Sequence, residues 1–379
     1  MLHIAVNARL LLPNKLEGLG WFSYQTLKHI TENHTEVKFT FIFDKAIANQ
    51  IVFNKSNTRC VVLHPQSRHP LLWYIFFQIS TKRYLKKLKP DLYLSPDGYI
   101  PLNSSIPSLA VIHDIAFEHY PETISTLVRK YYRYFFPKFS KQASRIATVS
   151  EFTKADLVNT YGIYEDKIDV VYNGINDSFK PISQADQLKI RQEFTQGNSY
   201  FIYLGNQNAR KNLHTTLSAF IKYSVKYNSD VHFVLIGGKG YLPESLDEFY
   251  QHPIHGNKIH NLGRVNDDEI VNKLVASAIA MVYISKYEGF GIPVLEAMQA
   301  GTAVITSNNS SMSEIANDAA YYVDSNGIAD TVFAMNKLNT DISFRNQLVS
   351  KGYEQVKKFS WAKTSELLWQ SCLKTITNK

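Results

Sequence analysis

Short apolar runs alternate with helical stretches along most of the chain. Nearly continuous apolar runs are typical of parallel strands covered on both faces, and their alternation with helices favours a doubly wound α/β fold. The pattern therefore predicts two α/β domains with parallel sheets. The predicted strands are HIAVNA, KFTFIF, DLYLS, SLAVIHD and RIATVS in the first half, and SYFIYLG, HFVLIGG, KIHNLG, AIAMVYIS, TAVITS and AAYYV in the second.

A polar stretch separates the two series of strands. It reads NGINDSFKPISQ, from Asn173 to Gln184, and it contains both glycine and proline. A chain of 379 residues is also too long for one ordinary core. We therefore expect one domain over residues 1–178 and a second over residues 179–358.

Composition and charge narrow the class of protein. Hydrophobic residues make up 45% of the chain and charged residues 20%, which is typical of a globular protein. The sequence has no apolar run long enough for a transmembrane helix, and its start, MLHIAVNARLL, does not have the pattern of a signal peptide. Its two cysteines, Cys60 and Cys372, provide no disulfide or metal framework, which fits a reducing cytoplasm.

The net charge of +8 lies mostly in the first half. Residues 1–180 hold 22 Lys and Arg against 15 Asp and Glu, whereas residues 181–379 hold 19 against 18. A basic first half indicates an anionic partner: nucleic acid, a phosphorylated substrate or a membrane surface.

The stretch YEGFGIPVLEAMQAG places two acids, Glu288 and Glu296, after a predicted buried strand. Its glycines allow a tight turn, and Pro293 suits the first position of a helix whose end Gly301 would cap. We expect free backbone N–H groups from Gly291 to Val294 to face an anion, with Glu296 in the first helical turn. The alternative is a solvated Glu288 and a Glu296 that only favours the helix start.

The stretch GNQNARKNL, from Gly205 to Leu213, lies between a predicted strand and a predicted helix. Arg210 and Lys211 are electrostatically misplaced there, since a helix start is already positive. A bound diphosphate would resolve the conflict. The alternative is a pair of solvated cations.

The first half has weaker candidates. Gly18 and Gly20 predict a loop that leads into a helix close to phosphate or sugar, but GxG without a third glycine is a weak dinucleotide fingerprint. His113 and Asp114 follow a strand, where the histidine could bind a substrate hydroxyl or be a buried, satisfied side chain. Ser150 is expected to cap a helix, and Asn173 to lie in a turn after a strand.

Motifs for other chemistry are missing from the sequence. It contains no DxD, HExxH, GxSxG or P-loop, so we expect neither a metal site nor a cofactor. The acid Asp44 comes too late after the first glycines for a dehydrogenase fingerprint, which disfavours that class.

Taken together, these blocks resemble the retaining glycosyltransferases of family 4, in particular bacterial mannosyltransferase-like members. The most specific block is Glu288 to Glu296, a Glu-x7-Glu spacing. GNQNARKNL, TVSEFTK, VYNGI, VIHDIAFEHYP and FSWAKTSELL follow the order of the family. The resemblance implies the GT-B fold: two Rossmann-like doubly wound domains facing a central cleft, with residues 359–379 crossing back to the first domain as a helix.

The resemblance also implies roles for individual residues. Arg210 and Lys211 match the cations on the diphosphate of a nucleotide-sugar, Glu296 the acid on the ribose and His113 the histidine of the catalytic site. Glu288 matches the acid near the donor sugar. The position after Gly20 is Trp21, where many members have arginine, which removes the expected phosphate contact there. Further donor contacts are expected at Gly18, Gly20, Gly205, Asn206, Arg264, Val265, Gly289, Phe290, Gly291 and Ile292, and Asp114, Ser150 and Asn173 are expected on the acceptor side.

The function implied by the resemblance is transfer of a hexose, mannose-type favoured, from GDP-mannose or a UDP-sugar to a glycan or lipid-linked acceptor. Without a metal, cations and helix amides would stabilise the departing phosphate. The alternatives are a GT-B nucleotide-sugar epimerase or hydrolase, and a non-catalytic nucleotide-sugar-binding module. No nucleic acid partner is expected.

Two stretches of the first half combine aromatic and basic residues. They run from Arg68 to Pro90 and from Arg129 to Arg145. Such a mixture suits the headgroup region of an anionic membrane, and it predicts a cytoplasmic protein that associates peripherally with the inner face of the membrane. The alternative is that the aromatic residues are core and the cations a solvated face.

Overall fold

The computed structural model describes residues 1–11, 16, 18–46, 55–240 and 245–377. Within them, the chain forms two compact units. The first comprises Met1–Gly174 with Phe359–Lys379, and the second Ile175–Lys358. The first crossing between the units thus follows Gly174, where the sequence pattern placed it at residue 178.

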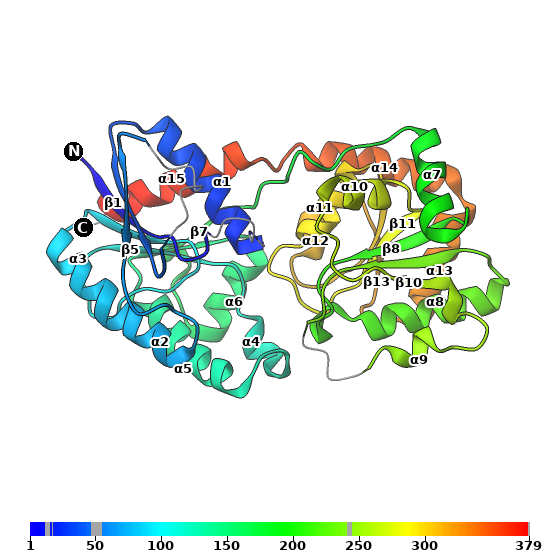
Figure 1. The fold of residues 1–379 in the computed structure, drawn as a ribbon, viewed down its shortest axis with the longest axis horizontal. Helices are drawn as coiled ribbons and strands as arrows, with labels where there is room; N and C mark the ends of the chain where they lie inside the picture. Colours follow the sequence, from blue (N-terminus) through cyan, green and yellow to red (C-terminus); the bar gives the residue numbers. More distant parts are fainter. Residues whose placement is uncertain (12–15, 17, 47–54, 241–244, 378–379) are drawn as a thin grey trace. The chain divides into compact units, whose positions relative to one another are not determined.

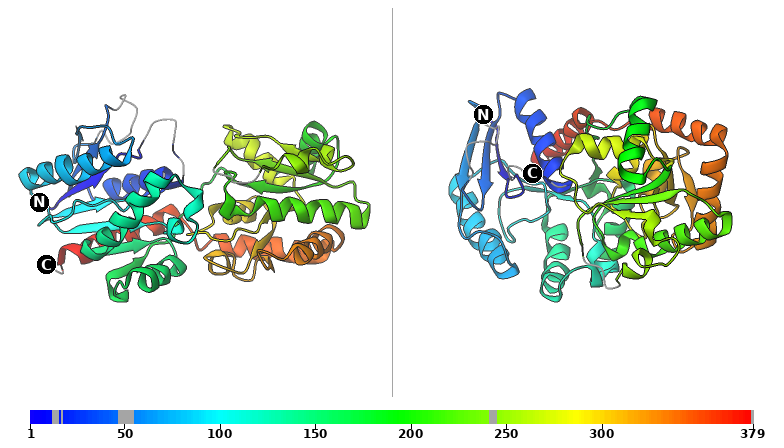
Figure 2. Two further views of the ribbon diagram at one scale, coloured as in Figure 1. Left: turned by 90° about the horizontal axis from the view of Figure 1, so that it is seen from below. Right: turned by 45° about the vertical axis from the view of Figure 1, so that its right-hand side comes forward.

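The first unit is built on a seven-stranded parallel sheet with the order β3-β2-β1-β4-β5-β6-β7. Its central strands are fully buried because helices cover both faces, as Figures 1 and 2 show. The strands are β1 (His3–Asn7), β2 (Lys38–Phe43), β3 (Thr58–Val62), β4 (Leu92–Ser95), β5 (Ser108–Ile112), β6 (Arg145–Thr148) and β7 (Ile168–Val170).

Helical segments alternate with these strands as in a doubly wound fold. They are α1 (Gly18–Asn33), α2 (Pro70–Tyr74), the π-helical η1 (Ile75–Thr81), α3 (Lys82–Leu88), α4 (Ala116–His119), η2 (Pro121–Thr123), α5 (Thr126–Gln142), α6 (Glu151–Tyr161), η3 (Glu165–Lys167) and the C-terminal α15 (Trp361–Thr377).

Helix α15 completes the first unit, although it lies at the far end of the chain. It packs against α1 and strands β4 to β6. Trp369 stacks on His34 with 3.9 Å between the ring centroids, and Lys374 Nζ lies 2.9 Å from Asp169 Oδ1. Apolar side chains on one face of the helix, including Leu368 and Cys372, are buried by this contact.

The second unit has a six-stranded parallel sheet with the order β10-β9-β8-β11-β12-β13. The strand order reverses between β8 and β11, so the loops after these two strands meet at a topological switch point. The strands are β8 (Tyr200–Leu204), β9 (His232–Ile236), β10 (Ile259–Asn261), β11 (Ala280–Tyr283), β12 (Ala303–Ser307) and β13 (Tyr321–Val323).

All six strands predicted for this half are present. The helical segments between and after them are α7 (Gln184–Thr195), η4 (Ala209–Lys211), α8 (Leu213–Tyr227), α9 (Asp247–Tyr250), η5 (Gly256–Lys258), α10 (Asp268–Ala276), α11 (Ile292–Gln299), α12 (Met312–Ala316), α13 (Ile328–Thr340) and α14 (Ile342–Val356).

Candidate functional site

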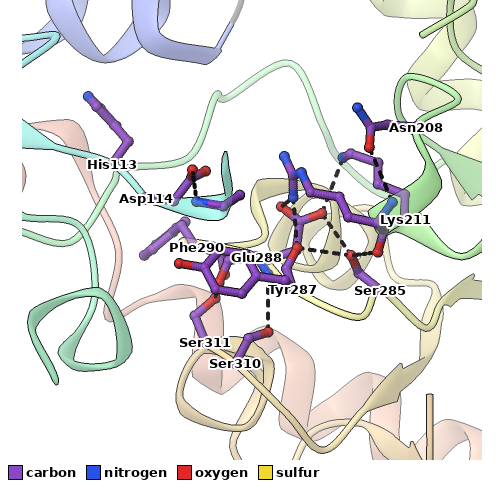
Figure 3. Close-up of polar contacts among 12 residues, drawn as sticks. His113, Asp114, Asn208, Lys211, Ser285, Tyr287, Glu288, Phe290, Ser310 and Ser311 are labelled. Carbon is purple, nitrogen blue, oxygen red and sulfur yellow. Dashed lines mark hydrogen bonds and ion pairs between the residues drawn. The ribbon is translucent and has the colours of Figure 1, made fainter. Parts of the chain in front are cut away.

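The switch point of the second sheet brings together two segments that were predicted to form a site, GNQNARKNL and YEGFGIPVLEAMQAG. Arg210 and Lys211 lie in η4, after β8, and Glu288 lies in the loop after β11. Glu288 Oε2 is 2.8 Å from Arg210 Nη1, and Glu288 Oε1 is 3.4 Å from Lys211 Nζ (Figure 3). The Glu288 side chain is only 8% exposed and Lys211 10%, so neither the solvated glutamate nor the solvated cations describe this site.

The two cations and the acid are locked by further contacts. Arg210 Nη1 donates to the Tyr287 carbonyl oxygen at 2.7 Å. Tyr283 bridges the other cation and the acid: it accepts from Lys211 Nζ at 2.6 Å and donates to Glu288 Oε1 at 2.8 Å. Ser285 Oγ also donates to Glu288 Oε1, at 3.1 Å. We did not predict Tyr283 or Ser285 as site residues, although both stand at the end of the predicted strand AIAMVYIS.

The charges around Glu288 decide its ionisation. Burial disfavours the carboxylate, but the charges of Arg210 and Lys211 and the hydrogen bonds from Arg210 and Tyr283 outweigh it. They lower the pKa of Glu288 to about 2. Glu288 is therefore ionised at neutral pH and counterbalances one of the two cations, which leaves one net positive charge in the cluster.

Gly205 makes the close approach of Lys211 to β8 feasible. Its φ of +149° and its missing side chain matter because a Cβ there would lie 3.1 Å from Lys211 Nζ and 3.2 Å from the Tyr203 hydroxyl. The neighbouring Asn206 is exposed, and its carbonyl oxygen accepts from Tyr203 Oη at 3.0 Å. Gly205 thus lies beside Lys211, and the expected contacts of Gly205 and Asn206 with a donor stay predictions.

The loop that carries Glu288 is fastened to the segment before α12. Ser311 Oγ donates to the carbonyl oxygens of Glu288 and Phe290, at 2.9 Å each, and Glu288 N donates to Ser310 Oγ at 3.2 Å (Figure 3). The serines follow the predicted strand TAVITS, within the stretch SNNSSMSEI, and no role was predicted for them. Gly289 and Phe290 are buried in this loop.

The start of α11 differs from the expectation. Gly291 is the N-cap with φ of +100°, a left-handed conformation that favours glycine, and a Cβ there would also press against the end of the Met312 side chain. The helix begins at Ile292, which makes Pro293 its second residue. The predicted run of free N–H groups is wrong, because Pro293 has none and Val294 N donates to the Gly291 carbonyl oxygen at 3.0 Å.

Glu296 was expected in the first turn of the helix, and this is wrong as well. It is the fifth residue of α11, because the helix begins at Ile292, one residue before the start predicted at Pro293. Burial and the nearby charge of Asp268 raise the pKa of Glu296 to about 7, although Lys211 acts in the opposite direction. Glu296 is therefore poised between its two protonation states near neutral pH, in contrast to Glu288.

The expected base-side residues lie in the loop between β10 and α10. Gly263 takes φ of +62° there, and Arg264 Nε donates to Asn266 Oδ1 at 3.1 Å. Arg264 is exposed and Val265 is partly buried. This loop follows β10, two strands away from β8 in the sheet.

In the first unit, the predicted glycine loop is wrong. Gly18 and Gly20 already belong to the first turn of α1, and neither has a positive φ. Open space surrounds Gly18, whereas a Cβ on Gly20 would meet the Leu10 carbonyl oxygen and the Leu16 side chain at 3.2 Å. Gly20 thus lets the helix start pack closely on the chain before it.

His113 follows β5 and is half-buried. Its Nε2 lies 2.9 Å from the Pro96 carbonyl oxygen, and its ring packs edge-on against Phe22 with 4.8 Å between centroids. A carbonyl oxygen can only accept, so Nε2 carries the proton and Nδ1 is the acceptor of the neutral ring. Burial lowers the pKa of His113, although the Pro96 contact and the charges of Asp114 and Asp97 act in the opposite direction.

Of the three other candidates of the first unit, Asp114 and Ser150 make structural contacts. Asp114 Oδ1 accepts from Ala116 N at 3.0 Å at the start of α4, and Ser150 Oγ, the N-cap of α6, accepts from Thr153 N at 3.0 Å. Asn173 is buried, and its side-chain oxygen accepts no hydrogen bond from the described residues. A Cβ on the adjacent Gly174 would collide with Trp361, so this turn admits the returning C-terminal segment.

A buried ion pair next to His113 was not predicted. Asp97 Oδ2 lies 2.6 Å from Arg9 Nε, and Asp97 Oδ1 accepts from Asn7 Nδ2 at 2.6 Å and from Ser95 Oγ at 3.0 Å. The Arg9 guanidinium sits 4.3 Å from the Tyr99 ring centroid. The signal in the sequence was that Asn7 lies near the end of the first predicted strand, Arg9 directly follows this strand, and Asp97 comes two residues after the strand DLYLS.

Comparison with known proteins shows the family to which the chain belongs. A family profile described as Glycosyl transferases group 1 matches residues 185–355, and one described as Glycosyltransferase Family 4 matches residues 18–179. The chain belongs to glycosyltransferase family 4. As a member, it is an enzyme that transfers a sugar.

Curated relatives of the transferase cover most of its length. It is 27% identical over 357 residues to O-antigen chain mannosyltransferase B of Escherichia coli, spanning 91% of this chain and 93% of the relative. It is 28% identical over 258 residues to O-antigen chain mannosyltransferase RfbU of Salmonella typhimurium, spanning 67% of each chain.

Solved structures confirm the fold. Sucrose-phosphate synthase of Thermosynechococcus elongatus superposes with a TM-score of 0.79 at 17% identity, over 100% of both chains. HepE of Anabaena, in complex with UDP and glucose, superposes with a TM-score of 0.74 at 16% identity, over 99% of this chain and 100% of that chain. The two Rossmann-like sheets of the transferase are those of the GT-B fold.

The aromatic and basic stretches of the transferase form α2, η1, α3 and α5. Most of their aromatic rings are core: Phe76, Phe77, Phe136 and Phe139 are all buried. Tyr134 is 57% exposed, however, and other apolar residues on α2 and α5 are also exposed. Among the helices that the structure describes, none is long and apolar enough to cross a bilayer.

Proposed function

We propose that the transferase moves a mannose-type hexose from a nucleotide-diphosphate sugar to a glycan or lipid-linked acceptor, with retention at the anomeric carbon and without a metal ion, in the synthesis of a cell-surface polysaccharide. The observation that carries the proposal is the pair of cations, Arg210 and Lys211, held by Glu288 at the switch point of the second sheet. The similarity to two O-antigen mannosyltransferases supports the choice of sugar and of polysaccharide synthesis.

The cation pair suits a diphosphate leaving group. As the bond between the anomeric carbon and the phosphate oxygen breaks, negative charge grows on the phosphate. Arg210 offers a planar set of donors and Lys211 a compact charge, and both are already oriented by Glu288 and Tyr283 before substrate arrives. This preorganisation supplies the charge stabilisation for which other transferases use a metal.

The proposed step is a displacement on one face of the sugar. The C1–O bond to the diphosphate breaks, and a C1–O bond to the acceptor hydroxyl forms on the same face. The acceptor proton passes to an oxygen of the departing phosphate. His113, with Nε2 donating to Pro96, would present Nδ1 as an acceptor for a hydroxyl of the substrate.

The roles of the two glutamates in the proposal differ. Glu288 positions the donor sugar and is not a covalent nucleophile, since two cations and a tyrosine hydroxyl already bind its oxygens. Glu296 accepts hydrogen bonds from the ribose hydroxyls. Trapping of a glycosyl–Glu288 adduct, detected by mass spectrometry, would contradict the first assignment.

A donor panel tests the function. GDP-mannose, UDP-glucose, UDP-galactose and ADP-glucose are offered with and without an extract of lipid-linked glycans, and release of the nucleotide is measured. We expect GDP-mannose to give the largest acceptor-dependent release; HepE, which was crystallised with UDP and glucose, makes UDP-sugars the second choice. Release that needs no acceptor would instead favour a hydrolase.

The acceptor side of the proposal is a peripheral contact with the inner face of the cytoplasmic membrane. Its support is a surface on α2 and α5 where exposed apolar residues stand beside cations. Leu71 is 62% exposed and Tyr74 43% on α2, and Leu127 is 51% and Tyr134 57% exposed on α5, which also carries Arg129, Lys130 and Lys138.

Vesicle binding checks this contact separately from catalysis. The transferase is expected to sediment with vesicles that contain phosphatidylglycerol at low salt, and less at high salt. Leu71→Ser with Tyr134→Ser should weaken sedimentation, while release of the nucleotide from the donor in the presence of a soluble acceptor stays unchanged. Failure to bind at low salt removes the membrane part of the proposal alone.

A further inference from the structure

A second polar cavity lies in the second unit, away from Glu288. Its volume is about 340 Å³, and it is lined by residues of α7 and α14 and by the chain just before β8 and β11. Because Ser199 and Ile279 precede these strands, the cavity lies at the amino-terminal edge of the sheet, whereas Arg210, Lys211 and Glu288 lie at the carboxyl edge. The size is in the range of sites for small ligands.

Two arginines dominate the lining of this cavity. Arg191 comes from α7 and Arg345 from α14, and both are partly buried. The rest of the lining contributes amides and a hydroxyl, and no Asp or Glu is among the described residues around the cavity. Two positive charges thus share one hollow without a carboxylate in its wall.

Each guanidinium uses only some of its N–H groups in hydrogen bonds to backbone carbonyl oxygens. Arg191 Nε and Nη2 both donate to the Ser277 carbonyl oxygen, at 3.0 and 2.8 Å, and Arg345 Nη1 donates to the Leu338 carbonyl oxygen at 3.0 Å. These carbonyls lie at the ends of α10 and α13, where a helix carries about half a negative charge. Such contacts fix the arginines but offset only part of their charge.

The charges of the two arginines act on one another. Burial lowers the pKa of Arg345, and the positive charge of Arg191 lowers it further. Two cations held together in a partly buried hollow destabilise each other unless an anion joins them. At the carboxyl edge Glu288 fills that role, whereas no Asp or Glu is among the described residues that line this cavity.

We propose that this cavity is a second anion site, which binds a small molecule bearing one or two phosphate groups between Arg191 and Arg345. Arginine forks match the oxygens of a tetrahedral phosphate, and the amides of Gln187 and Asn346 add donors. The site is separate from the donor site, and the inference does not depend on the identity of the donor or acceptor.

Calorimetric titration tests the site in an Arg210→Ala background, where the donor site no longer dominates phosphate binding. The probes are inorganic phosphate and diphosphate, compared with chloride at equal ionic strength. We expect saturable binding that Arg345→Gln weakens at least tenfold and that Arg345→Lys partly restores. Binding of equal strength with and without Arg345→Gln, or no binding at all, overturns the proposal.

A second variant guards against loss of folding. Asn346 is exposed, so Asn346→Asp adds a carboxylate to the lining without removing either arginine or its carbonyl contact. If the cavity binds an anion, we expect Asn346→Asp to weaken the binding of diphosphate at least tenfold. If Arg345→Gln lowers the melting temperature while Asn346→Asp leaves phosphate affinity unchanged, the arginines serve only as helix caps and the proposal fails.

The phosphate could belong to a free metabolite or to a lipid headgroup. Titration with glycerol phosphate in solution and sedimentation with phosphatidylglycerol vesicles separate the two sources. Dependence on Arg345 in the first assay alone indicates a free ligand, and dependence in the vesicle assay indicates a headgroup. Either result supports an anion site, and independence from Arg345 in both contradicts it.

Discussion

Glu288 and Arg210 form an ion pair of 2.8 Å that joins the loops after β11 and β8. The Glu288 side chain is 8% exposed and that of Arg210 18%, so the pair is largely shielded from water. The pair has two consequences. It holds a cation where a diphosphate is proposed to bind, and each charge offsets the cost of burying the other.

Substitution of Arg210 should affect both the stability of the protein and the binding of the donor, and the two effects can be measured separately. Arg210→Gln leaves the buried Glu288 with Lys211 alone, and we expect a loss of about 2–4 kcal/mol in the free energy of unfolding. We also expect kcat/KM for the nucleotide-sugar to fall by about 10²-fold, as when one donor to a developing oxyanion is removed. Denaturant unfolding and steady-state kinetics measure the two effects.

The control is the double variant Arg210→Gln with Glu288→Gln. Removing the buried charge should restore most of the stability, whereas donor affinity should stay low because the cation is still missing. Wild-type donor affinity in Arg210→Gln would mean that the diphosphate does not bind at this pair.

Donor binding should depend on pH through Glu296. The pKa of Glu296 is raised to about 7, so in the unliganded protein the carboxyl is protonated below this value. Ribose hydroxyls donate to the ionised form, and affinity for a nucleotide-sugar should therefore be constant above pH 7 and weaken as the pH falls below it. A nucleotide-sugar is the right probe, because its diphosphate does not titrate in this range.

Glu296→Gln serves as the control for this dependence. The amide keeps the size of the side chain but cannot titrate, so affinity measured by calorimetry from pH 5.5 to 8.5 should become flat. An unchanged pH profile in the variant would assign the titration to another group and remove Glu296 from the ribose.

His113 should be a neutral ring with its proton on Nε2. Burial lowers the pKa of His113, the Asp97 carboxylate acts in the opposite direction, and the adjacent Pro96 carbonyl accepts from Nε2. Asp97→Asn keeps the shape of the network around Arg9 and Asn7 but removes this charge, so we expect a lower pKa of His113 and a pH profile of kcat shifted in the same direction.

Nitrogen NMR of labelled histidine reads the tautomer directly, with His113→Gln used for assignment. A purely structural role of Asp97 would change stability and leave both the nitrogen shifts and the pH profile in place. Detection of the proton on Nδ1 in the wild type would contradict the geometry at Pro96.

Acid should destabilise the second unit through a histidine pair. His232 Nδ1 lies 2.8 Å from His260 Nε2, and burial together with the charges of His260 and Lys258 lowers the pKa of His232 to about 4. The folded protein then binds fewer protons than the unfolded chain, so stability is complete above about pH 6.5 and falls as the pH drops toward 4.

Melting temperature measured from pH 7.5 to 4.5 checks this prediction. His260→Gln leaves a hydrogen-bonding partner for His232 that cannot become charged, and the fall in melting temperature between pH 6.5 and 4.5 should become smaller. An equal fall in both proteins would place the acid sensitivity elsewhere, for example at other buried groups.

Much of the first sheet could be predicted, but two of its strands were missed. β3 and β7 are its edge strands. β3 is largely exposed or partly buried, and β7 spans only Ile168–Val170. An edge strand has a neighbour on one side only and needs no continuous apolar run, so it leaves little signal in the sequence.

The candidate site could likewise be predicted only in part. Spacing and turn chemistry placed Arg210, Lys211 and Glu288 after buried strands, and all three lie there. The sequence could not show that Tyr283 links Lys211 to Glu288, because that contact depends on β8 and β11 being neighbours. It also misplaced Glu296 by one position, since the left-handed backbone at Gly291 lets the helix begin at Ile292 and not at Pro293.

By itself, the sequence determined the two α/β units, the strands with continuous apolar runs and the segments that carry the site, because these follow from local hydrophobic pattern and turn chemistry. Only the tertiary structure decided the ionisation of the glutamates: Glu288 is held charged by two cations from another loop, while Glu296 is partly buried and lies near the charge of Asp268. A pKa is set by charges and burial contributed from distant parts of the chain, and these exist only once the chain has folded.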